Sequence, residues 1–252
     1  MLSPVDLVLP LIPLESDVYH NYIVNIGRAA VKTDSGWSGL QDWAERLMPR
    51  SHSVRGGGRR GTGAMAMDGV PDLAVTNYNT VCVLLGSGDG TFAAKTGYPA
   101  GNGVNSVAIG DMNRDGKPDL VVANYDHWSV SVLLGFGDGT FATKQDYPAN
   151  CPTSLAVADL NRDGRPDVVV TNARLEEPLI YTVSVLLGKG DGSLARPVAY
   201  AAGYYPSGVS IGDFNGDGIQ DLAVAADLGV TVYLGDGTGA MNSRTDYGLI
   251  RS

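Results

Sequence analysis

DMNRDGKPDL, residues 111–120, is a stretch that returns in closely related form further along the chain. Residues 159–168 have the sequence DLNRDGRPDV, and residues 213–222 have the sequence DFNGDGIQDL. A degenerate copy, AMAMDGVPDL, occupies residues 64–73, so that copies recur at intervals of about 50 residues. Each copy leads into an apolar run. Repetition at this period indicates an array of similar structural units.

Two further elements repeat between these copies. The first is VLLGSGDGTF at 83–92, which returns at 132–141 and 185–194 and, in a shortened form, at 232–240. An alternating apolar run followed by Asp-Gly is a strong hairpin signal. The second element is rich in tyrosine, proline and small residues and precedes each new copy. The pattern therefore predicts four short strands in each unit. In the second unit they are expected at 106–110, 119–124, 129–135 and 141–147.

Four antiparallel strands in each unit, repeated along the chain, are typical of a β-propeller. We therefore expect an all-β fold, a β-propeller or partial propeller of about four four-stranded blades. Residues 1–63 lack the repeat. We expect them to form a short irregular or helical N-terminal segment with an Arg/Gly-rich linker. In that segment Ser38 and Gln41 form a capping box for a short helix. The repeat region spans 64–252, with units at about 64–105, 106–153, 154–207 and 208–250.

The repeated loop has the composition of a calcium site. It places oxygen-bearing side chains at positions 1, 3, 5 and 9 and a glycine at position 6, where the backbone must bend sharply. The carbonyl of position 7 can add a further oxygen, and the absence of His and Cys favours a hard cation over zinc. The predicted ligands of about three structural Ca²⁺ ions are Asp111, Asn113, Asp115, Lys117 (carbonyl) and Asp119; Asp159, Asn161, Asp163, Arg165 (carbonyl) and Asp167; and Asp213, Asn215, Asp217, Ile219 (carbonyl) and Asp221.

The same residue types also form ordinary Asx turns, so one such loop alone would not distinguish a cation site from a tight turn. Three complete copies in register favour the cation site, because three carboxylates in one loop repel each other unless a cation lies among them. In the degenerate copy, Ala64 and Ala66 stand at positions 1 and 3. We predict that this copy binds no metal, or binds it weakly.

The repeats resemble the FG-GAP/VCBS family, which includes the blades of integrin α-subunit propellers and many bacterial secreted or surface proteins. The resemblance rests on D-x-N-x-D-G-x-x-D followed by an apolar strand, and it covers about 64–250. It implies a calcium-stabilised propeller that serves extracellular recognition or cell adhesion, in a secreted, periplasmic or cell-surface protein. Members usually close a ring of more blades than the four units found here. A small four-bladed ring, self-association or assembly with another chain, and a non-functional fragment of a larger repeat protein with missing blades all remain open.

Composition excludes several classes of protein. The formal net charge of −9 and the pI of about 4.7 argue against binding to a nucleic-acid backbone, which needs clustered Lys and Arg. No apolar run reaches the roughly 18 residues of a membrane span. The N-terminal MLSPVDLVLPLIPL lacks the basic region of a convincing signal peptide. Cys82 and Cys151 occupy non-equivalent positions of different repeats, so we expect no disulfide between them.

A partner site is expected at the end of the molecule opposite the acidic loops, where the loops between second and third strands and the connectors between blades come together. The sequence YDHW supplies the candidate ligand-binding residues Tyr125, Asp126, His127 and Trp128 there. Aromatic rings beside a carboxylate and an imidazole suit a carbohydrate or protein ligand. The alternative, in which these rings only cover loop edges, stays open.

The sequence predicts a binding protein without catalytic residues. GWSGL, residues 36–40, lacks the final glycine of the G-x-S-x-G nucleophile motif. His20, His52 and His127 show no metal-ligand spacing with one another. A polysaccharide-acting lyase or hydrolase is the alternative, since a fold does not by itself settle function.

Overall fold

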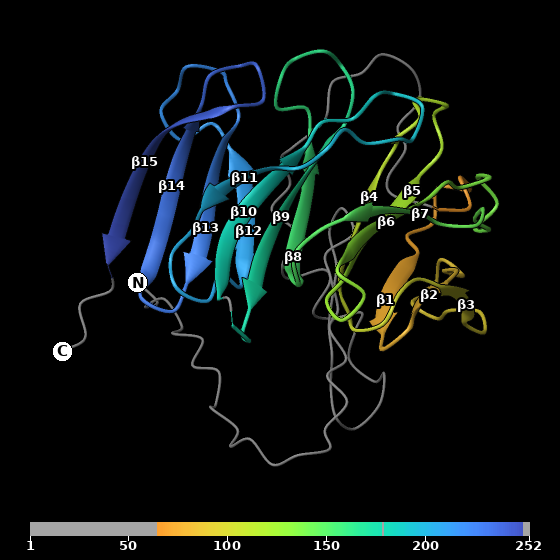
Figure 1. Cartoon of the computed structure of the whole chain (residues 1–252). Helices are drawn as coiled ribbons and strands as arrows, with labels where there is room; N and C mark the ends of the chain where they lie inside the picture. Colours follow the sequence, from red (N-terminus) through yellow and green to blue (C-terminus); the bar gives the residue numbers. More distant parts are fainter. Residues whose placement is uncertain (1–64, 178, 249–252) are drawn as a thin grey trace, which may run out of the picture.

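The computed structural model describes residues 65–177 and 179–248, and this region is built from antiparallel β-sheets (Figure 1). Strands follow one another within each sheet in chain order, as up-and-down blades do. The predicted all-β propeller-like fold is confirmed. The predicted N-terminal helix and linker lie outside the described residues. The strands are β1 (Leu73–Asn77), β2 (Thr80–Leu84) and β3 (Thr96–Pro99) in blade 1; β4 (Val104–Gly110), β5 (Asp119–Asn124), β6 (Ser129–Leu133) and β7 (Gln145–Pro148) in blade 2; β8 (Pro152–Ala158), β9 (Asp167–Arg174), β10 (Ile180–Leu186) and β11 (Val198–Ala201) in blade 3; and β12 (Gly208–Gly212), β13 (Asp221–Ala226), β14 (Gly229–Gly235) and β15 (Met241–Gly248) in blade 4.

The strand boundaries differ from the predicted ones in several places: β4 begins at Val104 and not at 106, and β6 ends at Leu133 and not at 135. Blade 1 has three strands within the described residues, whereas the repeat predicted four. The last strand of blade 2 begins at Gln145 and not at Phe141, because Phe141 forms an isolated bridge with Gly135 that closes the Asp-Gly turn. The chain then needs residues 142–144 to reach the outer edge of the sheet.

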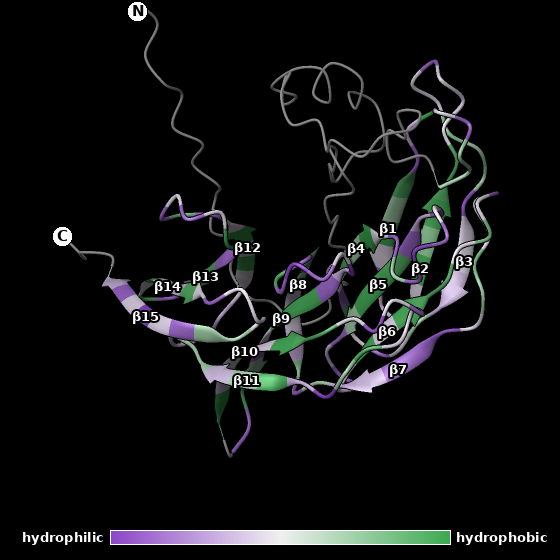
Figure 2. Ribbon diagram, turned by 90° about the horizontal axis from the view of Figure 1, so that it is seen from above, coloured by the Kyte–Doolittle hydropathy of each residue, from purple (hydrophilic) through white to green (hydrophobic). Residues whose placement is uncertain are grey.

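The four sheets stand side by side in an open arc (Figure 2). The first strand of each complete blade, β4, β8 and β12, lies on the concave side, and the last strands β7, β11 and β15 lie on the convex side. Blades 1 and 4 occupy opposite ends of the arc. The described residues therefore form a partial propeller, and they do not close into a four-bladed ring.

The hydrophobic core lies between neighbouring blades. Because side chains alternate across a strand, each middle strand presents one set of residues toward the next blade and another toward the preceding blade. In β5, Val121 packs toward blade 3, and Leu120 and Val122 pack toward blade 1. We call these the forward and backward faces of a blade. Burial of both faces explains why β5 and β6 are buried along their whole length.

The Asp-Gly turns of blades 2 and 3 each form a hydrogen bond to the preceding blade. The backbone N–H of Gly139 donates to the Met65 carbonyl at 3.1 Å, and that of Gly192 donates to the Met112 carbonyl at 3.1 Å. Gly139 has a φ of 82°, and a Cβ there would lie 2.6 Å from a methyl group of Leu85. The glycine of the repeated DGTF motif is thus required both by its backbone conformation and by contact with a leucine of the neighbouring VLLG motif.

Candidate functional site

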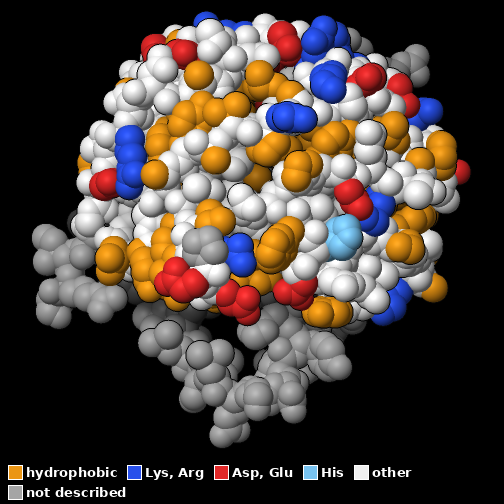
Figure 3. Space-filling model, viewed as in Figure 1, with side chains coloured by type: hydrophobic (Ala, Val, Ile, Leu, Met, Phe, Trp, Pro, Cys, Tyr) orange, Lys and Arg blue, Asp and Glu red, His pale blue; other side chains and the backbone are white. Residues whose placement is uncertain are grey.

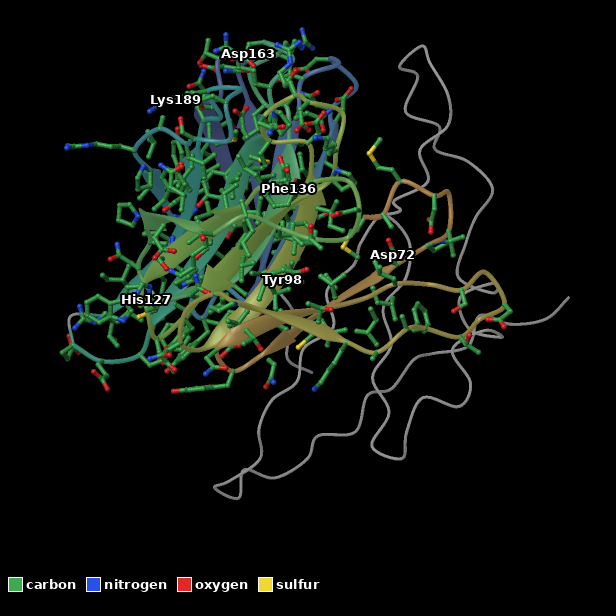
Figure 4. The ribbon with its side chains drawn as sticks, turned by 90° about the vertical axis from the view of Figure 1, so that its right-hand side faces the viewer. Asp72, Tyr98, His127, Phe136, Asp163 and Lys189 are labelled. Atoms are coloured by element: carbon green, nitrogen blue, oxygen red, sulfur yellow. The ribbon has the colours of Figure 1, made fainter. Side chains whose placement is uncertain are left out.

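The acidic loops and the YDHW segment lie at opposite ends of the blades. Each acidic loop joins the first and second strands of a blade, whereas residues 125–128 join the second and third strands of blade 2. Figure 4 shows Asp163, from an acidic loop, at one end of the sheets and His127 at the other. The expected separation of a loop end carrying the acidic motifs from a loop end carrying the aromatic segment is confirmed.

The first two oxygen-bearing side chains of each acidic loop accept hydrogen bonds from the same backbone N–H group. In the blade 2 loop, Asp111 Oδ1 and Asn113 Oδ1 accept hydrogen bonds from the backbone N–H of Asp115, at 3.0 and 3.1 Å. Asp111 Oδ2 also accepts from the N–H of Gly116 at 2.9 Å. Two candidate ligand oxygens therefore come close together through one shared donor. The equivalent pairs in blades 3 and 4 do the same: Asp159 and Asn161 accept from Asp163, and Asp213 and Asn215 accept from Asp217.

The aspartate at position 9 has a structural role that sequence reasoning missed. Asp119 is fully buried, and its two carboxylate oxygens accept from the N–H groups of Met112 and Gly135, at 2.7 and 2.8 Å. It thereby ties the acidic loop to the VLLG motif at the end of the third strand. The same bridge recurs in the other three blades, through Asp72, Asp167 and Asp221.

Blade 1 shows that this bridge does not require the other ligand positions. Asp72 accepts from the N–H groups of Ala66 and Gly86, at 3.0 and 2.8 Å, although alanines stand at positions 1 and 3 of that loop. The sequence held one signal for this role. The degenerate copy keeps Asp72 at position 9 although it lacks the oxygen ligands of a cation site at positions 1 and 3.

Burial perturbs the bridging aspartates. Loss of solvation raises the pKa of Asp119 to about 6, against the opposing effect of the hydrogen bonds from Gly135 and Met112. Burial likewise raises the pKa of Asp167. A nearby cation would favour the ionised carboxylate, since an opposite charge lowers the pKa of an acid.

The donor set of the acidic loops suits calcium, which prefers carboxylate, amide and backbone oxygens. Within residues 65–177 and 179–248, no three His, Cys, Asp or Glu side chains form a ready metal cluster. A calcium ion would therefore depend on the asparagine amide oxygen at position 3 and the carbonyl at position 7 as well as on the aspartates. In two loops the position 7 side chain also faces the carboxylate at position 5, with Lys117 Nζ 3.5 Å from Asp115 and Arg165 Nη1 3.7 Å from Asp163.

The YDHW segment is held in place by contacts to its own blade and to blade 3. The Tyr125 hydroxyl donates to the Ala173 carbonyl at 3.1 Å, and His127 Nδ1 lies 2.9 Å from Ser129 Oγ. Trp128 has a φ of 55° and leaves 48% of its surface exposed. These contacts fix Tyr125 and His127, and they leave Asp126 and Trp128 accessible to a ligand.

Two residues that the sequence did not single out complete this end of the molecule. The Arg174 guanidinium lies over the Trp128 ring, 4.8 Å from its centroid. Tyr181, at the other end of the loop that follows Arg174, packs against the tilted rings of Tyr204 and Tyr205 at centroid distances of 4.7 and 5.2 Å. Figure 3 shows acidic, basic and hydrophobic side chains gathered along this lower edge, close to the histidine. No sequence spacing joins Arg174 to Trp128, because they come from different blades.

Comparison with models of protein families shows to which family the chain belongs. An FG-GAP-like repeat matches residues 67–122 and 111–170, and an FG-GAP repeat matches residues 205–240. The chain belongs to the FG-GAP repeat family. The matched segments cover the three complete acidic loops and most of the degenerate one of this FG-GAP protein. No helix of the described residues is long and apolar enough to cross a membrane.

The solved structures that match this chain are distant from it in sequence. One is an Agrocybe aegerita lectin that recognises non-reducing terminal N-acetylglucosamine, with 21% identity and a TM-score of 0.46 over 69% of this chain and 48% of the lectin. Another is the Tc holotoxin pore of Photorhabdus luminescens, with 18% identity and a TM-score of 0.40 over 74% of this chain and 9% of the toxin. This chain thus spans about half of the first structure and a small part of the second. The search of curated proteins returned no match.

Proposed function

We propose that this FG-GAP chain is a calcium-stabilised propeller module for extracellular recognition or adhesion, and that it binds a carbohydrate or protein ligand at the loop end opposite the acidic loops. The observation that carries this proposal is the exposed Trp128 ring with the Arg174 guanidinium packed over it. An indole whose position is fixed by a neighbouring blade offers a flat apolar surface at low entropic cost.

The surroundings of Trp128 supply polar groups of the kind that orient a ligand. Asp126 and His127 are exposed beside it. Burial raises the pKa of Tyr125, the first residue of this segment, and the charges of Cys151, Asp126, Glu176 and Tyr205 add to that effect. Carboxylates next to aromatic rings match the pattern of hydroxyl and apolar faces on a sugar.

Calcium would act at the other end, as a structural ion. It would lie among the oxygen ligands of an acidic loop and neutralise their carboxylates, so that binding of the ion would be linked to folding. The millimolar calcium outside cells suits surface-exposed loops of this kind, which supports a secreted, periplasmic or cell-surface location.

Binding is tested on a glycan array and a panel of extracellular matrix proteins, followed by calorimetry on the strongest ligand. Trp128→Ala is expected to weaken binding at least tenfold, in line with the cost of truncating a central aromatic anchor. Phe136→Ala is the matched control, because Phe136 is 58% exposed and lies in the Asp-Gly turn of the same blade, away from Trp128. Equal losses in both variants would contradict the proposed site.

The same ligands test the alternative of a polysaccharide lyase or hydrolase. Chain cleavage that disappears in Asp126→Ala and His127→Ala would replace the binding module with an enzyme. Binding without cleavage in the wild-type protein supports the module.

A further inference from the structure

Each blade buries its forward face against the next blade, and blade 4 presents such a face without a following blade among the described residues. Register identifies the equivalent positions: Val130 pairs with Tyr147 in blade 2, Val183 with Tyr200 in blade 3, and Val230 with Tyr247 in blade 4. Figure 2 shows blade 4 at one open end of the arc.

Exposure at these positions changes sharply at blade 4. Val130 and Val183 are 0% exposed, whereas Val230 is 36% exposed. Tyr147 is 9% exposed, whereas Tyr247 is 59% exposed. Position 2 of the acidic loops shows the same increase in exposure at blade 4. Met112 and Leu160 are 1% and 0% exposed, whereas the equivalent Phe214 is 52% exposed. We call the resulting surface the terminal face; it consists of Phe214, Ala223, Val230, Val232, Leu234 and Tyr247.

The interfaces between neighbouring blades show which groups pack against a forward face. At the junction of blades 1 and 2, the Tyr98 hydroxyl donates to the Gly139 carbonyl at 3.1 Å, and the Tyr98 ring meets Phe141 edge-on with centroids 5.2 Å apart. Gly139 also lies over Leu85 and donates its N–H to Met65. The partner of a forward face is therefore a turn glycine followed two residues later by a large apolar side chain.

Gly192 and Gly239 repeat this contact at the next two junctions. A Cβ on Gly192 would lie 2.7 Å from Leu134, and one on Gly239 would lie 2.6 Å from Leu187. Leu234 is the next leucine in this series, and it is part of the terminal face. A glycine of an adjoining Asp-Gly turn is thus the group that fits over it.

Blade 1 carries the complementary surface. Gly90 has a φ of 87°, close to the 82° of Gly139, and Phe92 bridges Gly86 as Phe141 bridges Gly135. Leu84 and Phe92 are half-buried, whereas the equivalent Leu133 and Phe141 of blade 2 are 1% and 8% exposed. The terminal face and this backward face hold no charged residue at the positions named, as is usual for the centre of an interface.

We propose that the terminal face of blade 4 binds the backward face of blade 1 in a second copy of this chain. In this arrangement Gly90 of the second copy lies over Leu234 and donates its N–H to the Phe214 carbonyl, and Phe92 packs against the Tyr247 ring. The inference concerns the assembly of the arc and does not depend on the proposed ligand site. Because the two surfaces differ, the contact is heterologous; it closes a ring if the rotation permits and otherwise extends head to tail.

The test measures the mass of the full chain by sedimentation velocity from about 1 to 100 μM, a range chosen to include the affinities of weak and transient interfaces. The wild-type protein is expected to assemble. Tyr247→Lys and Phe92→Glu, tested separately, are each expected to weaken assembly at least tenfold. Phe136→Lys is the matched control, because Phe136 is 58% exposed, like Tyr247, and belongs to neither face.

Mixing the two variants distinguishes a heterologous contact from a symmetric one. Tyr247→Lys chains keep an intact blade 1 face and Phe92→Glu chains keep an intact terminal face, so an equimolar mixture is expected to form a one-to-one dimer. A wild-type monomer throughout the range, assembly that Phe92→Glu leaves unchanged, or a mixture that stays monomeric would each overturn the proposal. Phe92→Gln replaces Phe92→Glu if circular dichroism shows that the latter is unfolded.

Discussion

At the scale of single residues, the aspartates of one acidic loop divide into two roles. Those at positions 1 and 5 are solvent-accessible and accept hydrogen bonds from their own loop. Asp72, Asp119, Asp167 and Asp221 at position 9 are buried and tie the loop to the third strand. The motif therefore combines the donors of a cation site with a bridge that belongs to the fold itself.

Asp72→Ala separates these two roles. It removes the acceptor of the Ala66 and Gly86 N–H groups, and leaving a buried donor unpaired costs about 1–3 kcal/mol. We expect a loss of stability of that size in urea unfolding, equal in calcium and in chelator. Asp111→Ala is the comparison, and it is expected to reduce stability in calcium and to have little effect in chelator. A calcium-dependent loss in Asp72→Ala would contradict the structural role.

The aspartates of the Asp-Gly turns offer a second prediction. The Thr140 hydroxyl and backbone N–H hydrogen-bond Asp138 and lower the pKa of that carboxyl below its ordinary value. A carboxyl with a lowered pKa stabilises the fold above its unfolded-state pKa, and this contribution is lost as the pH falls through the folded-state value. Thr140→Val removes the hydroxyl, so NMR titration is expected to show the pKa of Asp138 moving up toward that of a free aspartate. An unchanged titration would show that the hydroxyl has no such effect.

At the scale of the strand and loop, glycine spacing controls how a blade closes. A Cβ on Gly188 would lie 2.0 Å from the Pro166 carbonyl oxygen, and one on Gly135 would lie 2.0 Å from that of Pro118. These glycines also donate to the bridging aspartates. The glycine of VLLG thus lets the third strand approach the acidic loop closely enough for the bridge to form.

Gly188→Ala is expected to destabilise the protein by at least the roughly 1–3 kcal/mol typical of overpacking, because a backbone carbonyl cannot move aside easily. Gly164→Ala is the control. Gly164 has a φ of 77°, and a Cβ added there would have no neighbouring atom nearer than 3.9 Å, so we expect it to cost only the roughly 1–2 kcal/mol of backbone strain. Urea unfolding of both variants measures the difference, and equal losses would contradict the close-approach explanation.

The sequence predicted the all-β fold of repeated antiparallel sheets because it rests on local signals, such as Asp-Gly turns and alternating apolar runs. It missed features that depend on contact between repeats. Arg174 reaches Trp128 from another blade. The late start of β7 follows from the Gly135–Phe141 bridge, which no propensity predicts. The bridging role of Asp119 was hidden because a calcium ligand and a buried acceptor require the same residue.

At the scale of the whole molecule, the open arc gives the fold two unlike ends and places the three acidic loops along one edge. Three acidic loops with three aspartates each lie side by side at the same end of the blades. Their mutual repulsion destabilises the folded state in the absence of cations, and it is relieved when divalent ions bind the folded loops. The unfolded chain holds these residues apart and has no such sites, so calcium is expected to stabilise the folded form selectively.

Thermal unfolding tests this linkage. At free calcium of about ten to one hundred times the dissociation constant, each occupied loop adds about 1.4–2.7 kcal/mol, so three loops raise the melting temperature by many degrees. Asp111→Ala, Asp159→Ala and Asp213→Ala combined in one variant are expected to abolish the shift, whereas Asp68→Ala, in the degenerate loop, is expected to keep it. Magnesium at the same concentration controls for ionic screening, because it prefers a tighter octahedral shell. If wild-type melting curves in millimolar calcium and in excess chelator superimpose, the loops act as turns only, and the bridging aspartates alone account for the geometry that the four blades share.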